Sequence, residues 1–92
     1  MTFKEKYNHE KTWHGRVMVM EIYHLTMTHR VKGWTLAKSA DYFACSIGLL
    51  SENLKLAHAL HQDPSFIKCV SRQDALKKLN GNGVRRGDDD DE

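Results

Sequence analysis

Four breaks divide the chain into short segments that have the periodicity of α-helices. The breaks lie at Gly33, at residues 44–46, at Asp63-Pro64 and at Gly81. Between them apolar residues recur every three or four positions, and no segment alternates as a half-buried strand would. With 92 residues the chain has room for one small domain. We therefore expect an all-α fold, a small bundle of about four helices.

Capping residues predict where these helices begin. Thr35 and Ser46 each precede an apolar periodic segment, as N-cap residues do. Ser71 is followed three positions later by Asp74, a pattern that resembles a capping box. The expected helices cover about residues 11–28, 35–43, 46–61 and 71–80. We expect residues 1–10 to form a polar N-terminal arm, 11–80 a helix-turn-helix domain, and 81–92 a disordered acidic tail.

The first helix is apolar around most of its circumference. One apolar stripe comprises Trp13, Val17, Met20, His24, Met27 and Val31, and a second comprises Met18, Ile22 and Leu25. The polar arc that remains is narrow and comprises Arg16, Tyr23, Thr26 and Arg30. A helix that is apolar over such a wide arc packs against more than one neighbour. We expect one neighbour to be a second copy of the chain, with a dimer interface at Trp13, Met18, Ile22 and Leu25.

Charge is distributed unevenly along the chain. The formal net charge is +2, but residues 88–92 are all acidic. Without these five carboxylates, fourteen basic residues face seven acidic ones, so residues 1–87 carry +7. A basic body indicates a polyanionic partner. For the acidic tail two interpretations remain open: it solubilises the protein, or it competes with DNA for the basic surface.

The segment from Leu36 to Leu56 has the layout of a helix-turn-helix unit. Ala40 supplies the small residue at which two closely approaching helices can meet, and a tight turn follows at residues 44–46. Cys45 provides a small buried residue at the centre of this turn, and Leu50 and Leu54 anchor the second helix. Ala44 stands where glycine is common, because the turn uses a left-handed backbone conformation.

The stretch from Ser46 to Ala57, SIGLLSENLKLA, is similar to the recognition helix of ParB/KorB-like and phage helix-turn-helix proteins. A serine opens the helix in those families, and a leucine-rich continuation follows. The resemblance covers about residues 34–79. It implies binding to double-stranded DNA by a transcriptional regulator or a partition-like factor of prokaryotic or phage origin.

Helix geometry identifies the side chains that would meet DNA, because a recognition helix presents its N-terminal half to the major groove. Ser51, Glu52 and Ile47 would contact base edges, and Lys55 would contact phosphate or guanine. Residues before the recognition helix would hold the DNA backbone. The complete expected set is Arg30, Lys32, Thr35, Lys38, Ser46, Ile47, Gly48, Ser51, Glu52 and Lys55.

Other functions fit the sequence less well. The expected recognition helix has a single basic residue, so a helical protein-interaction module stays open, as does a phage DNA-packaging subunit that forms a ring. His58 and His61 are spaced for one helix face, but no cysteine pair completes a zinc site. We expect no metal, no cofactor, no small-molecule substrate and no enzymatic activity. Without an apolar segment for a membrane or a signal peptide, Cys45 and Cys69 are expected to be reduced thiols in a cytoplasmic or nucleoid-associated protein.

Overall fold

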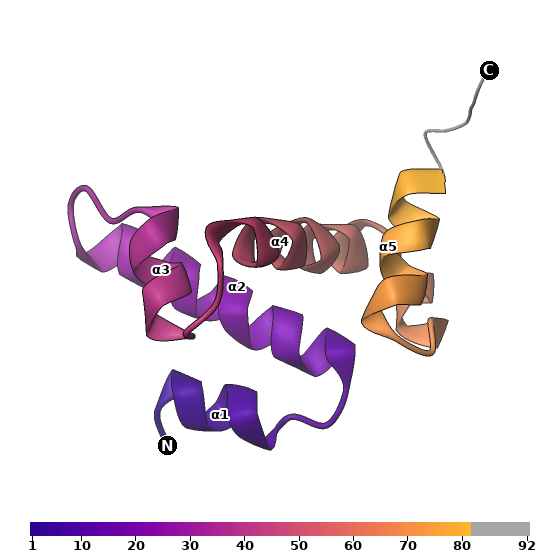
Figure 1. Cartoon of the computed structure of the whole chain (residues 1–92), viewed down its shortest axis with the longest axis horizontal. Helices are drawn as coiled ribbons and strands as arrows, with labels where there is room; N and C mark the ends of the chain where they lie inside the picture. The colour runs from indigo at the N-terminus through magenta and orange to yellow at the C-terminus, as the bar shows by residue number, and fades with distance from the viewer. Residues whose placement is uncertain (82–92) are drawn as a thin grey trace.

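The computed structural model describes residues 1–81, which form α-helices and one 3-10 helix and contain no strand. This confirms the expected all-α class. The elements are α1 (Phe3–His9), α2 (Trp13–Arg30), α3 (Leu36–Tyr42), α4 (Ile47–Gln62), η1 (Pro64–Lys68) and α5 (Arg72–Gly81). The long helices α2 and α4 pack together at the centre. Figure 1 shows α1 along α2, α3 near the start of α4, and α5 at its end.

The N-caps predicted from the sequence are confirmed. The Thr35 hydroxyl accepts a hydrogen bond from the Lys38 amide, and α3 begins at Leu36, directly after Thr35. Ser46 and Ser71 cap α4 and α5 in the same way. Each cap satisfies one of the amide groups that a helix start leaves without an intrahelical partner. Residues 82–92, which include most of the expected tail, lie outside the described residues, and Gly81 is the last residue of α5.

The core has two parts that follow one another along α2. The first is the buried set Val17, Leu56, Ala57, Ala59, Leu60, Phe66 and Ala75, and the second is Met20, Tyr23, Ala40, Phe43 and Leu50. The first part fixes η1 and α5 to α2 and α4. The second fixes α1 and α3 to the same two helices. The α3-turn-α4 unit therefore rests on a packed aromatic and aliphatic base.

The structure corrects the expected N-terminal arm, because residues 3–9 form the helix α1. A capping box starts it: the Thr2 hydroxyl accepts from the Glu5 amide, and the Glu5 carboxylate accepts from the Thr2 amide. The hydrogen bond from the Thr2 amide to the carboxylate is the main cause that lowers the pKa of Glu5. The apolar side of α1 presents Phe3 and Tyr7 to the second part of the core. The polar composition of residues 1–10 concealed an amphipathic helix of two turns.

The sequence prediction placed Tyr23 wrongly because it did not include α1. Its expected place was the polar arc of the first helix, but its side chain is only 6% exposed. The Tyr23 ring stacks on Tyr42 with centroids 4.1 Å apart, and it meets Phe3 and Phe43 edge to face. Such aromatic pairs stabilise a core beyond the area that they bury. Once α1 and α3 cover this side of α2, an aromatic residue is required there.

None of the helices in residues 1–81 has both the length and the hydropathy that crossing a membrane requires.

Candidate nucleic-acid interface

The connection between α3 and α4 is a tight turn held by backbone hydrogen bonds. The Cys45 amide donates to the Ala40 carbonyl at 3.0 Å, and the Ala44 amide donates to the Asp41 carbonyl at 3.1 Å. Ala44 has a φ of +56°, so alanine occupies the left-handed conformation that glycine adopts more easily. Ala40 is buried where the two helices meet, and Cys45 packs against the second part of the core. These features match the expected helix-turn-helix layout.

The helix α4 has one buried side and one side turned to solvent. Leu50, Leu56 and Ala57 are fully buried against α2 and its neighbours. On the opposite side Ile47 is 51% exposed, and Gly48 and Lys55 are exposed as well. Ser51 lies on this side and is half-buried. The structure therefore gathers four of the predicted DNA-contacting residues on one accessible face of α4.

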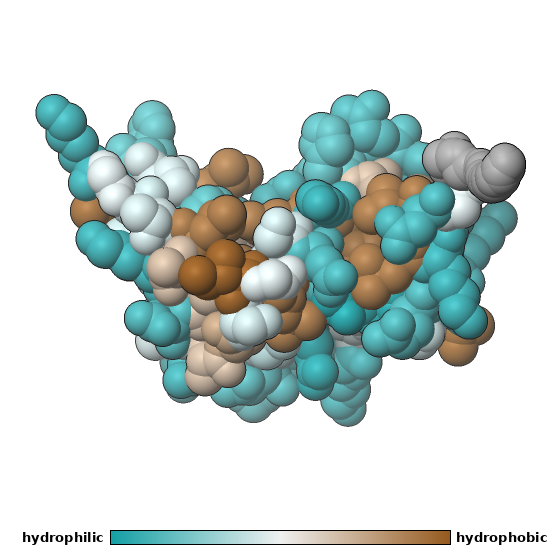
Figure 2. All heavy atoms as spheres, turned by 45° about the horizontal axis from the view of Figure 1, so that its top comes forward, coloured by the Kyte–Doolittle hydropathy of each residue, from teal (hydrophilic) through white to brown (hydrophobic). Residues whose placement is uncertain are grey.

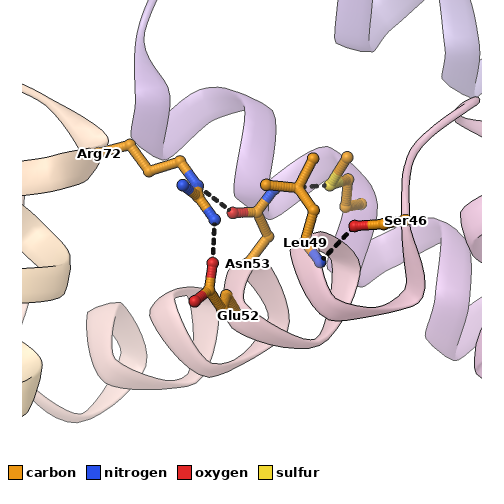
Figure 3. Close-up of polar contacts among 6 residues, drawn as sticks. Ser46, Leu49, Glu52, Asn53 and Arg72 are labelled. Atoms are coloured by element: carbon orange, nitrogen blue, oxygen red, sulfur yellow. Dashed lines mark hydrogen bonds and ion pairs between the residues drawn. The ribbon is translucent and has the colours of Figure 1, made fainter.

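Ser46 and Gly48 have different roles at the start of this face. The Ser46 hydroxyl accepts from the Leu49 amide at 3.0 Å, so its acceptor function is used in capping (Figure 3). A Cβ atom placed on Gly48 would have the Ser46 hydroxyl at 4.0 Å as its nearest neighbour. The fold therefore does not require a glycine at position 48. The missing side chain leaves open surface beside Ile47.

Glu52 has a protein partner that the sequence did not indicate. Its carboxylate forms a 2.7 Å ion pair with the guanidinium of Arg72 from α5. Figure 3 shows the same guanidinium bonded to Asn53. The Asn53 amide group in turn donates to the sulfur of Met20 at 3.1 Å. Glu52 thus belongs to a network that joins α2, α4 and α5, which leaves it less suited to the base contact expected from the sequence.

The predicted backbone-contacting residues gather around the loop between α2 and α3. Arg30 ends α2 and Lys32 lies in the loop, and both are exposed. Thr35 is exposed but its hydroxyl is used as the α3 cap. Lys38 is exposed, with its ammonium group 5.6 Å from the centre of the Trp34 ring. Three basic side chains are therefore exposed between the end of α2 and the first turn of α3.

Three hydrogen-bonded side chains, from Trp34, Ser39 and His24, connect this loop to α3 and α2. The Trp34 indole donates to the hydroxyl of Ser39 at 2.8 Å, and the His24 Nδ1 lies 2.6 Å from the same hydroxyl. Ser39 is completely buried, so its polar group depends on these partners. Burial lowers the pKa of His24. His24 is the polar residue of the apolar stripe. It is half-buried, and its ring forms a hydrogen bond with Ser39.

An apolar groove lies along the solvent side of α4. Its volume is about 700 Å³, and α5, η1 and the start of α3 complete its walls. Figure 2 shows apolar side chains exposed on this side of the molecule. The lining residues are Leu36, Ser51, Leu54, Lys55, His58, Ala59, Gln62, Asp63, Phe66, Leu79 and Asn80. Ser51 and Lys55 therefore belong both to the groove and to the predicted DNA-contacting set, an overlap that the sequence did not reveal.

The residues expected at a dimer interface fall into two groups. The Trp13 indole donates to the Cys69 carbonyl at 2.9 Å and packs against the first part of the core, so Trp13 holds the domain together. Met18 is half-buried and packs against the same part of the core. Ile22 and Leu25 are 50% and 59% exposed. The accessible part of the expected interface is therefore confined to the outer side of α2.

His58 and His61 have different surroundings, although both lie on α4. His61 bonds to the carboxylate of Glu21 at 2.7 Å, and His58 lines the groove. Within residues 1–81 no three histidine, cysteine or acidic side chains gather as metal ligands would. Cys45 and Cys69 are free, half-buried thiols, and burial raises the pKa of Cys45.

Comparison with known proteins found no matching family model, no matching curated protein and no matching solved structure.

Proposed function

We propose that this protein binds double-stranded DNA through the exposed face of α4, as a small transcriptional regulator or partition-like factor without enzymatic activity. One observation carries the proposal: the tight turn after α3 presents the capped N-terminal half of α4 to solvent, with Ile47, Gly48 and Ser51 on its outer side and Lys55 one turn further along. This is the half of a recognition helix that enters the major groove.

The charge of the described residues supports a polyanionic partner. Removing Arg85, Arg86 and the five terminal acidic residues from the totals leaves twelve basic and seven acidic residues in 1–81, a net charge of +5. Arg30, Lys32 and Lys38 provide exposed cations from the end of α2 to the first turn of α3. Such cations neutralise phosphates and position a protein on the duplex without reading its sequence.

The proposed residues have two kinds of role: some can contact DNA directly, and others hold the helices in place. Ile47 can contact a thymine methyl group, and Ser51 can bond to a base edge. Lys55 lies two turns along α4 and is suited to phosphate or to guanine. Thr35 and Ser46 cap helices and act by holding α3 and α4 in place. Glu52 acts in the same indirect way, through its ion pair with Arg72.

A dimer would double the contacts on a symmetric site. The exposed apolar pair Ile22 and Leu25 lies on the side of α2 that faces away from α4 and the core. We propose this pair as the centre of the homodimer interface. A DNA-binding protein of this kind would act in the cytoplasm or on the nucleoid.

Selection from a pool of random duplexes tests the proposal. A specific DNA-binding protein should enrich a shared short sequence, and a symmetric repeat of that sequence would support the dimer. A variant with Lys55→Gln should enrich it less strongly, while Lys11→Gln, in the loop between α1 and α2, should behave as the unmodified protein does. If no duplex binds at about 50 mM salt, where phosphate contacts are strong, the proposal is wrong and the protein-interaction function becomes the better one.

A further inference from the structure

The apolar groove beside α4 lies at the end of the described chain. Leu79 and Asn80 from the last turn of α5 form one wall, and Gly81 follows directly. The apolar lining comes from the middle and the C-terminal half of α4 and from η1, through Leu54, Ala59 and Phe66. A segment that leaves α5 at Gly81 therefore begins at the edge of this groove.

The groove also presents a positive charge without a counter-ion. Its charged lining residues are Lys55 and Asp63. Asp63 lies 3.8 Å from the ammonium group of Lys78, whereas Lys55 has no ion-pair partner among the described residues. An occupant with an apolar side chain and nearby carboxylates would suit both the apolar wall and Lys55.

The sequence after Gly81 has this composition. Val84 is its one apolar residue other than glycine, and residues 88–92 supply five carboxylates. Eleven extended residues reach about 36 Å. The sixteen residues of α4 span about 24 Å. The segment can therefore reach every part of the exposed face of α4, including Lys55.

We propose that residues 82–92 bind in this groove within the same chain, with Val84 against the apolar wall and the terminal carboxylates near Lys55. Because Ser51 and Lys55 line the groove, the bound segment covers part of the proposed DNA-contacting face and competes with phosphate. The competition with phosphate rests on the proposed function, whereas the contact between residues 82–92 and the groove does not. Weak, non-specific DNA binding should be suppressed more than specific binding.

Nuclear magnetic resonance of the full chain tests the contact directly. Val84→Ser should shift the amide signals of groove residues such as Leu54, His58 and Leu79, and the shifts should not depend on protein concentration. The matched control is Val70→Ser, because Val70 is 89% exposed and does not line the groove. The combined substitutions Asp88→Asn, Asp89→Asn, Asp90→Asn and Asp91→Asn should shift the Lys55 signal. If both tail variants leave the groove signals unchanged, the contact does not exist, and concentration-dependent shifts would assign it to another copy.

Duplex binding by the same variants tests the competition. With Asp88→Asn, Asp89→Asn, Asp90→Asn and Asp91→Asn combined, affinity for a non-specific duplex at about 50 mM salt should rise about threefold or more, and the gain should shrink as salt is added. Shifted groove signals in a protein that binds no duplex would retain the contact and reject the proposed function. Shifted signals with unchanged duplex affinity would reject the competition.

Discussion

The Arg72 guanidinium donates a hydrogen bond to the side-chain oxygen of Asn53 over 2.6 Å, and this contact joins α5 to α4. Asn53 is only 3% exposed. Arg72→Met should lower the free energy of unfolding by about 1–3 kcal/mol, because it leaves a buried oxygen without its donor. Chemical denaturation measures this change. The control is Glu52→Gln, which removes the half-exposed ion pair and should cost less than about 1 kcal/mol. An equal loss of unfolding free energy in the two variants would contradict a stabilising role for the hydrogen bond between Arg72 and Asn53.

Phe3 tests the unexpected packing of α1. Its ring meets Tyr23 edge to face with centroids 5.5 Å apart, and α1 reaches the core through it. Phe3→Ala should lower the free energy of unfolding by about 1–2 kcal/mol, since the side chain is half-buried and part of an aromatic pair. Asn8→Ala, at an exposed position of the same helix, should have little effect. If Phe3→Ala also has little effect in thermal unfolding, residues 1–10 behave as the arm that their composition indicated.

His24 predicts a pH dependence of stability. Its burial lowers the pKa from the ordinary value of 6.5, so the folded protein favours the neutral ring. The unfolded chain takes up a proton more readily, and the contribution of His24 is therefore present above about pH 6.5 and lost as the pH falls through the folded-state pKa. Between pH 7.5 and 5.5 the melting temperature should fall more for the unmodified protein than for His24→Gln. The exposed residue His29 provides the control, and His29→Gln should retain the full pH dependence.

Gly48 separates folding from DNA binding. Alanine at this position meets nothing closer than 4.0 Å, so Gly48→Ala should leave stability unchanged or raise it by up to about 1 kcal/mol. The same methyl group would hinder close approach of DNA, and duplex affinity should fall. Gly33→Ala gives the contrast, because Gly33 has a φ of +79° and alanine there should destabilise the fold by about 1 kcal/mol. Unchanged duplex affinity in stable Gly48→Ala would remove Gly48 from the interface.

The proposed dimer has its own test. Charges at the exposed pair, Ile22→Glu with Leu25→Glu, should give a folded monomer by light scattering, because neither side chain is part of the core. Val70→Glu places a single glutamate at an exposed position elsewhere and should leave the dimer intact. A monomeric unmodified protein at micromolar concentration would contradict the interface.

The sequence predicted the helix starts well and the partners of individual side chains less well. Thr35, Ser46 and Ser71 act locally, so the sequence pattern alone identified them. Tyr23 was assigned to the wrong side because its environment depends on α1, a short helix whose tertiary contacts no local pattern reveals. Likewise, Arg72 meets Asn53 from 19 positions away. The sequence did contain a signal for this contact: Asn53 is a polar residue on the buried face of a helix, and such a residue requires a hydrogen-bond partner.

The salt dependence of duplex binding is the decisive measurement for DNA recognition by α4. Affinity should fall linearly with salt on logarithmic axes, with a slope set by the number of phosphates contacted. Lys55→Gln should weaken binding and, if Lys55 contacts phosphate, reduce the magnitude of that slope by about 1, while Lys11→Gln should leave it unchanged. DNA recognition by α4 is contradicted if the protein binds no duplex at about 50 mM salt, or if the two lysine variants lose affinity equally.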